Sequence, residues 1–265
     1  MLAAGYYLRV GSLALSFLLL LLLQLPSARG ELTDGRTASK EIRIPILAYH
    51  RFGPVASDSM TVTTPVFESQ LRYLGDHGYS VIKLRQLVEG CLGKGQPLSS
   101  RSVVITVDDG HKSVYTDLLP LLKKYRIPVT LFLYPSALSN ASYAMTWDQV
   151  REVKETGLVD LQSHTYWHPN FKNEKRRLTT AEYEKFVEMQ FKKSKERLEK
   201  EFHVKVDVLA WPFGIYDEEL MSMATRAGYV AALSIDRRHA SISDNAMALP
   251  RYLMSNRDRL SGCGL

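Results

Sequence analysis

The chain has 265 residues, 45% of them hydrophobic, and a formal net charge of +6. This length suits one large α/β domain or two small domains, and the hydrophobic content excludes global disorder. Over residues 172–205 the lysines and arginines interleave with glutamates, which is typical of a solvated helix face. We therefore expect no nucleic-acid partner.

The first thirty residues have the pattern of a secretory signal peptide. Arg9 precedes an apolar run that ends in the leucines 18–23, and Ala28-Arg29-Gly30 offers a small-residue cleavage site. The run is shorter than the roughly 20 residues of a membrane-spanning helix, although an uncleaved membrane anchor is the alternative. We expect residues 1–30 to be the signal peptide, residues 31–265 to be the domain, and the protein to be exported to the periplasm or beyond. Cleavage would remove two basic residues and leave a net charge of +4.

Cys91 and Cys263 are the only cysteines of the chain. In an exported protein they could form a disulfide, but the sequence does not show whether they lie close together, so the pairing stays open. Their separation is not that of metal-ligand cysteines.

Strand-like and helix-like segments alternate along the rest of the chain. Short apolar runs predict strands at residues 42–49, 79–83, 103–110, 127–134, 158–162, 206–211, 229–235 and 248–254. Helices are predicted between them, for example from the capping residues Thr146 and Thr179, and Pro120 should bend the helix at 113–125. This alternation predicts an α/β fold with a parallel sheet or barrel and the active-site loops at one face.

Two acids and two histidines follow predicted strands. Asp108 and Asp109 close an apolar run that Gly110 ends, and His164 and His168 stand four residues apart. Asp109, His164 and His168 could hold a divalent metal with open positions. Adjacent residues of an extended chain point to opposite sides, which leaves Asp108 free to accept a proton from water. Taken singly, an Asp-Asp-Gly turn and a His-x-x-x-His pair are also common structural features.

Three motifs in order resemble those of the NodB-homology polysaccharide deacetylases, carbohydrate esterase family 4. The matching segments are Thr106–Gly110, Ser163–His168 and Ala210–Gly214, and the resemblance covers roughly residues 42–254. It implies a distorted (β/α) barrel of about seven strands. It also implies a divalent metal, usually zinc, and the removal of N-acetyl groups from amino-sugar polymers.

The resemblance also assigns roles to individual residues. Asp108 is the base, and the metal ligands are Asp109, His164 and His168. Substrate-groove residues of the third motif are Trp211, Pro212 and Phe213. Trp167, inside the second motif, is a candidate for stacking on a sugar ring, but both tryptophans could instead be core residues.

Two departures from the family pattern leave roles to fill. Many members carry an arginine that orients the base where this chain has Leu209-Ala210, and Arg251, which we count with the groove residues, is a candidate substitute. Arg251 could instead make a purely structural ion pair. The late histidine that serves as general acid in many members is also missing. His50 follows the first strand, as in the branch that acts on poly-N-acetylglucosamine, and is predicted to be the acid; the alternative is a hydrogen bond to the neighbouring loop.

We therefore expect an exported, metal-dependent hydrolase that removes N-acetyl groups from an N-acetylglucosamine-containing polysaccharide of the cell envelope or exopolysaccharide. One alternative is a deacetylase of peptidoglycan or chitin oligomers. Another is a carbohydrate-binding relative without catalysis, although such a protein has no need of a free base beside a metal site.

Overall fold

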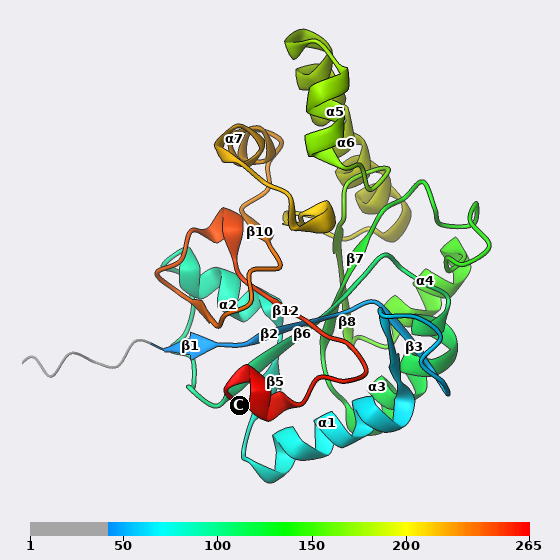
Figure 1. The fold of residues 1–265 in the computed structure, drawn as a ribbon, viewed down its shortest axis with the longest axis vertical. Coiled ribbons are helices and arrows are strands. Elements are labelled where there is room, and N and C mark those ends of the chain that lie inside the picture. The colour runs from blue at the N-terminus through cyan, green and yellow to red at the C-terminus, as the bar shows by residue number, and fades with distance from the viewer. Residues whose placement is uncertain (1–41) are drawn as a thin grey trace, which may run out of the picture. The chain divides into compact units, whose positions relative to one another are not determined.

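The computed structural model describes residues 42–265, and most of their strands form one large parallel sheet (Figure 1). The predicted signal peptide lies outside the described residues. In spatial order the strands are β10 (Ala231–Leu233), β9 (Val208–Ala210), β8 (Val159–Ser163), β7 (Val129–Leu133), β6 (Ser102–Asp108), β2 (Ile46–Tyr49) and β12 (Tyr252–Leu253). β5 (Ser80–Ile82) pairs with the first half of β6. The prediction of a distorted barrel of about seven strands is confirmed.

The segment that ends in β12 contacts both edges of this sheet. Tyr252 and Leu253 pair with β2, and Leu249 forms a parallel bridge with Leu233 of β10. Arg251 lies between these two contacts and is fully buried. The segment that leads into the last strand therefore carries Arg251 into the interior of the curved sheet.

Helices surround the sheet (Figure 1). They are α1 (Thr64–Asp76), α2 (Leu84–Cys91), α3 (Leu119–Tyr125), α4 (Trp147–Glu155), α5 (Phe171–Arg177), α6 (Thr180–Phe202) and α7 (Glu218–Arg226). Two small sheets pair β1 (Arg43–Ile44) with β11 (Ala240–Ser241) and β3 (Arg51–Gly53) with β4 (Thr61–Thr63). Short 3₁₀ turns lie at Pro212–Gly214, Ala246–Ala248 and Leu260–Cys263. None of the helices within residues 42–265 is long and apolar enough to cross a membrane.

The helix starts follow local sequence signals. Thr146 and Thr179 each accept a hydrogen bond from the backbone three residues on and complete the predicted capping boxes of α4 and α6, a contribution of about 1 kcal/mol each. The predicted helix at 113–125 is different: a π-helical turn, Val114–Leu118, precedes α3. Pro120 near the junction has no N–H to continue a regular helix.

Strand alternation separates the inside of the sheet from the layer beneath the helices. On β6, Val103, Ile105 and Val107 belong to the outer core cluster, whereas Val104 belongs to the inner one. Asp108 has the parity of Val104 and therefore points inward. Complete burial of such aliphatic side chains stabilises the fold by about 1.5–3 kcal/mol each.

The two cysteines do not form a disulfide. Cys91 ends α2, where its Sγ lies 3.7 Å from the carbonyl oxygen of Ser241, and Cys263 is buried in the last turn of the chain. The pairing that the sequence left open is absent from this structure.

Candidate active site

A cleft of about 270 Å³ opens where the parallel strands end. β6 delivers Asp108 and Asp109 to it, the loop after β8 delivers His164 and His168, and His50 follows β2. Ligand sites of parallel α/β folds lie at this end of the strands because the following loops converge there. The structure thus brings together all the predicted catalytic and metal-binding side chains.

Asp108 is held by a buried ion pair with Arg251. The two guanidinium nitrogens Nη1 and Nη2 donate to Oδ1 and Oδ2 of Asp108, each at 2.8 Å. Arg251 also donates through Nε to the Ser234 carbonyl and through Nη1 to the Thr106 hydroxyl. Burial alone would raise the pKa of Asp108, but Arg251 and His164 outweigh it and hold the pKa well below its usual range. Asp108 is therefore an ionised and rigidly oriented carboxylate.

Asp109 turns toward the histidines because the backbone leaves the strand here. Asp109 and Gly110 both have positive φ, 72° and 71°, a region that costs most residues energy. A Cβ on Gly110 would lie 2.7 Å from Cδ2 of Leu133. Glycine therefore also avoids a steric clash with this side chain. This tight turn places the two adjacent carboxylates in different surroundings.

Asp109, His164 and His168 form the one group of potential metal ligands found among the described residues. Oδ1 of Asp109 lies 3.6 Å from Nε2 of His164 and 3.7 Å from Nε2 of His168. These separations exceed a hydrogen bond, and this buried oxygen has no hydrogen-bond partner. Donors about 2.0–2.2 Å from one ion lie roughly this far apart, so the three residues fit a divalent cation.

The histidines are in the neutral form that metal binding needs. Nδ1 of His164 donates to the carbonyl oxygen of Ala210 at 2.8 Å, which leaves the Nε2 lone pair facing Asp109. Burial, reinforced by His168, lowers the pKa of His164 to about 3. Burial also lowers the pKa of His168, and burial raises the pKa of Asp109. An unpartnered acid beside two neutral imidazoles is the donor set expected before a cation is added.

His50 lines the same cleft and is 9% exposed. Its Nδ1 is buried without a hydrogen-bond partner, so the structure does not show the bond to the neighbouring loop that was the alternative for this residue. Burial lowers the pKa of His50, while the carboxylates of Asp108 and Asp109 act in the opposite direction. Burial therefore favours the neutral imidazole, whereas the two nearby carboxylates favour the protonated form.

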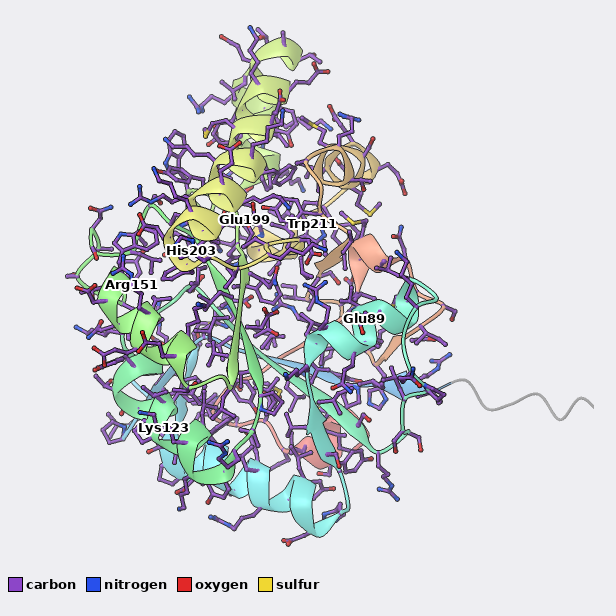
Figure 2. All side chains as sticks on the ribbon, turned by 180° about the vertical axis from the view of Figure 1, so that it is seen from behind. Glu89, Lys123, Arg151, Glu199, His203 and Trp211 are labelled. Atoms are coloured by element: carbon purple, nitrogen blue, oxygen red, sulfur yellow. The ribbon has the colours of Figure 1, made fainter. Side chains whose placement is uncertain are left out.

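Three of the five predicted substrate-groove residues are buried. Trp211, labelled in Figure 2, is 1% exposed; it lines the cleft, and its ring packs against that of Phe191 of α6. The reason is parity, because Val208 and Ala210 of β9 point inward and Trp211 points outward. Pro212 is also buried. Arg251 is fully buried and lines the cleft, where it binds the Asp108 carboxylate, the contact expected of a substitute for the base-orienting arginine.

The other two groove candidates remain accessible. Phe213 is 56% exposed, and its ring centroid lies 4.6 Å from that of His168. Trp167 is 51% exposed and packs on one side against Phe186 of α6. Contact of either ring with a sugar stays a prediction.

One neighbour of the ligands was missed. Tyr134 directly follows β7, and its ring centroid lies 5.4 Å from that of His168. Its hydroxyl is hydrogen-bonded to that of Tyr143 on the next loop. The strand-end rule that singled out Asp108 and His164 would also have indicated Tyr134.

The fold and this site together define a class of protein. Its members are parallel half-barrels that carry an Asp-His-His donor set and, beside it, a second aspartate bound by an arginine. Residues 95–232 match the polysaccharide deacetylase family, which is more than half of the chain. The chain therefore belongs to the polysaccharide deacetylase family and is an enzyme of that class, as the motifs predicted. His50 and Arg251 lie outside the matched range.

Individual relatives agree with this assignment. The chain is 27% identical over 250 residues to the poly-beta-1,6-N-acetyl-D-glucosamine N-deacetylase of Escherichia coli (strain K12). The matched region covers 81% of this chain and 37% of that protein. It is 27% identical over 201 residues to the enzyme of the same name from Staphylococcus aureus (strain MRSA252), and the matched region covers 74% of this chain and 68% of that protein. The structure of IcaB from Ammonifex degensii matches with a TM-score of 0.73 at 22% identity, and the match covers 84% of this chain and 96% of that one. This structural similarity shows that the two proteins share a fold.

Proposed function

We propose that this deacetylase removes N-acetyl groups from a poly-N-acetylglucosamine polymer with the help of a divalent cation, most simply Zn²⁺. The observation that carries the proposal is the unpartnered Oδ1 of Asp109 between two neutral imidazoles, beside a separate ionised Asp108. The names of the Escherichia coli and Staphylococcus aureus relatives support this polymer as the substrate.

The residues divide the hydrolysis into two proton transfers. Water attacks the acetyl carbonyl carbon, and Asp108 accepts the proton that the water loses. The C–N bond then breaks, and the sugar nitrogen needs a proton because an amide anion is too basic to leave. In this proposal protonated His50 donates it, and the products are acetate and a free amine. A lowered pKa makes protonated His50 a stronger acid, although a scarcer one at neutral pH.

Asp109, His164 and His168 would hold the cation. When bound, it would polarise the acetyl carbonyl and lower the pKa of the attacking water, which suits a base as weak as Asp108. Arg251 keeps that base charged and aimed through two hydrogen bonds at 2.8 Å. The exposed Phe213 ring beside His168 offers a face for the sugar.

We also propose that the protein acts outside the cytoplasm, in the periplasm or the extracellular polymer. The signal-peptide pattern of residues 1–30 supports this location. A cell-envelope or exopolysaccharide substrate would be met there.

The experiment compares acetate release from three substrates. Poly-β-1,6-N-acetylglucosamine, chitin oligomers and peptidoglycan are each incubated with the chain without its first thirty residues. The proposal expects release chiefly from the first. Faster release from chitin oligomers or peptidoglycan would overturn the proposed substrate while leaving the enzyme class intact.

A further inference from the structure

The two histidines of the candidate metal site are joined by a loop that is not a helical turn. Thr165 and His168 have φ values of 66° and 57°. These values lie in the left-handed region, which residues other than glycine rarely adopt. Such a backbone conformation is energetically unfavourable, and it persists only where its surroundings determine it. Something outside the loop must therefore fix its shape.

The backbone N–H groups of this loop are all bound by side chains. Thr165 donates to Oγ of Ser163 at 3.1 Å, and His168 donates to Oγ1 of Thr165 at 3.1 Å. The two residues between them both donate to one atom, Oε1 of Gln190, at 3.2 Å from Tyr166 and 2.8 Å from Trp167. Gln190 thus holds the middle of the loop from helix α6.

Gln190 is one of two fully buried polar residues on the inner face of α6. Ser194, one turn further on, is also fully buried, and its hydroxyl is 2.8 Å from that of Ser163. Apolar residues such as Val187 and Phe191 occupy the rest of this face. Buried polar groups are costly unless they are hydrogen-bonded, and here their partners are the ligand loop and the strand end that carries it.

The two histidines depend on the loop to different degrees. His164 directly follows β8, and its backbone N–H and its Nδ1 are hydrogen-bonded to the carbonyls of Leu133 and Ala210. His168 lies four residues further on, behind the segment that Gln190 holds. A change at Gln190 should therefore displace His168 more than His164.

We propose that Gln190, supported by Ser194, is a positioning residue that fixes the ligand loop and, through it, His168. The inference rests on the proposed metal site. Without the Gln190 oxygen, two backbone N–H groups lose their acceptor and the strained loop can relax. Loss of an outer residue that orients a ligand typically weakens metal binding about 10–100-fold.

The structure offers a matched control in Gln162. It is also fully buried, and its Oε1 also accepts two backbone hydrogen bonds, from Asp207 at 3.1 Å and Val208 at 2.9 Å. Gln162 is only two residues from His164, but it holds the start of β9 and no part of the ligand loop. Gln162→Leu should therefore cost stability without weakening metal binding.

The test titrates the chelator-stripped chain with Co²⁺, followed by visible absorption, and records thermal unfolding of each metal-free variant. We expect Gln190→Leu to raise the Co²⁺ dissociation constant about 10–100-fold, and Gln162→Leu to leave it unchanged at a similar loss of melting temperature. Gln190→Glu, which keeps the acceptor oxygens, should bind more tightly than Gln190→Leu. Ser194→Ala should raise the constant more mildly, and it serves if the leucine variant does not fold.

The outcomes separate this inference from the proposal on which it rests. Wild-type affinity in Gln190→Leu or Ser194→Ala would overturn it, as would equal weakening in Gln162→Leu. A wild-type chain that does not bind Co²⁺ or Zn²⁺ would overturn the metal site itself.

Discussion

Replacing Arg251 by methionine should destabilise the protein strongly and in a pH-dependent way. Both members of the Arg251–Asp108 pair are buried, and two hydrogen bonds of 2.8 Å join them. Removal of one partner leaves a buried charge uncompensated, which typically costs about 3–5 kcal/mol. Methionine fills much of the space of the arginine stem, so we attribute most of the loss to the unpaired carboxylate.

The pH dependence follows from the pKa of Asp108. In the wild type the pair holds this pKa below the unfolded value of about 3.9. Its stabilisation is therefore complete above about pH 4 and is lost as the pH falls further. In Arg251→Met, burial without the cation raises the pKa of Asp108 above its unfolded value, so the destabilisation decreases when the pH falls and Asp108 takes up a proton. The gap between the two proteins should be largest near pH 7 and smaller at pH 5.

Urea unfolding of metal-free protein at pH 7 and pH 5 measures this gap, and Arg85→Met is the control. Arg85 binds the buried Asp207 but is 30% exposed, and Lys205 also contacts Asp207, at 2.7 Å. We expect a smaller loss of stability there, because Asp207 keeps one cation. An Arg251→Met variant as stable as the wild type at pH 7, or a gap that does not change with pH, would refute the reasoning.

Three further substitutions test other parts of the site. Asp108→Asn should keep its metal, measured by elemental analysis, yet lose about 10²–10⁴-fold in turnover; loss of the metal would mean that the roles of the two aspartates are exchanged. His50→Ala should lower turnover at full metal occupancy and alter the basic side of the pH–rate profile, whereas near-normal turnover would remove His50 from the mechanism. Gly110→Ala should lower the free energy of unfolding by about 1–2 kcal/mol because of its φ of 71°, and an unchanged value in urea unfolding would contradict the strain argument.

Much of the fold could be predicted because local patterns determine it. Apolar runs marked the strands, and the Thr146 and Thr179 capping boxes marked two helix starts. Strand ends located Asp108 and His164, because parallel strands bring their carboxyl ends to one face. The π-helical turn before Pro120 could not be predicted, because a proline in a helical segment is compatible with either a bend or a π-helical turn.

Side-chain direction and long-range pairing were harder to predict. The motif indicated Trp211 as a groove residue, and Trp211 does line the cleft, but the motif did not show that its ring packs against Phe191 of α6. Arg251 and Asp108 are 143 residues apart; the family resemblance suggested Arg251 as the arginine that orients the base, and the folded sheet shows how the ion pair forms. Gln190 and Ser194 left a weak signal, as polar residues at core-facing positions of an amphipathic helix.

Metal removal and restoration tests the central claim most directly. The chain is stripped with a chelator and given increasing amounts of Zn²⁺, and acetate release from poly-β-1,6-N-acetylglucosamine is measured at each addition. We predict that release stops in the stripped protein and returns in proportion to the metal up to one ion per chain, and that His164→Ala does not recover. Full acetate release by the metal-free chain would contradict the assignment of Asp109, His164 and His168 as ligands of a catalytic metal.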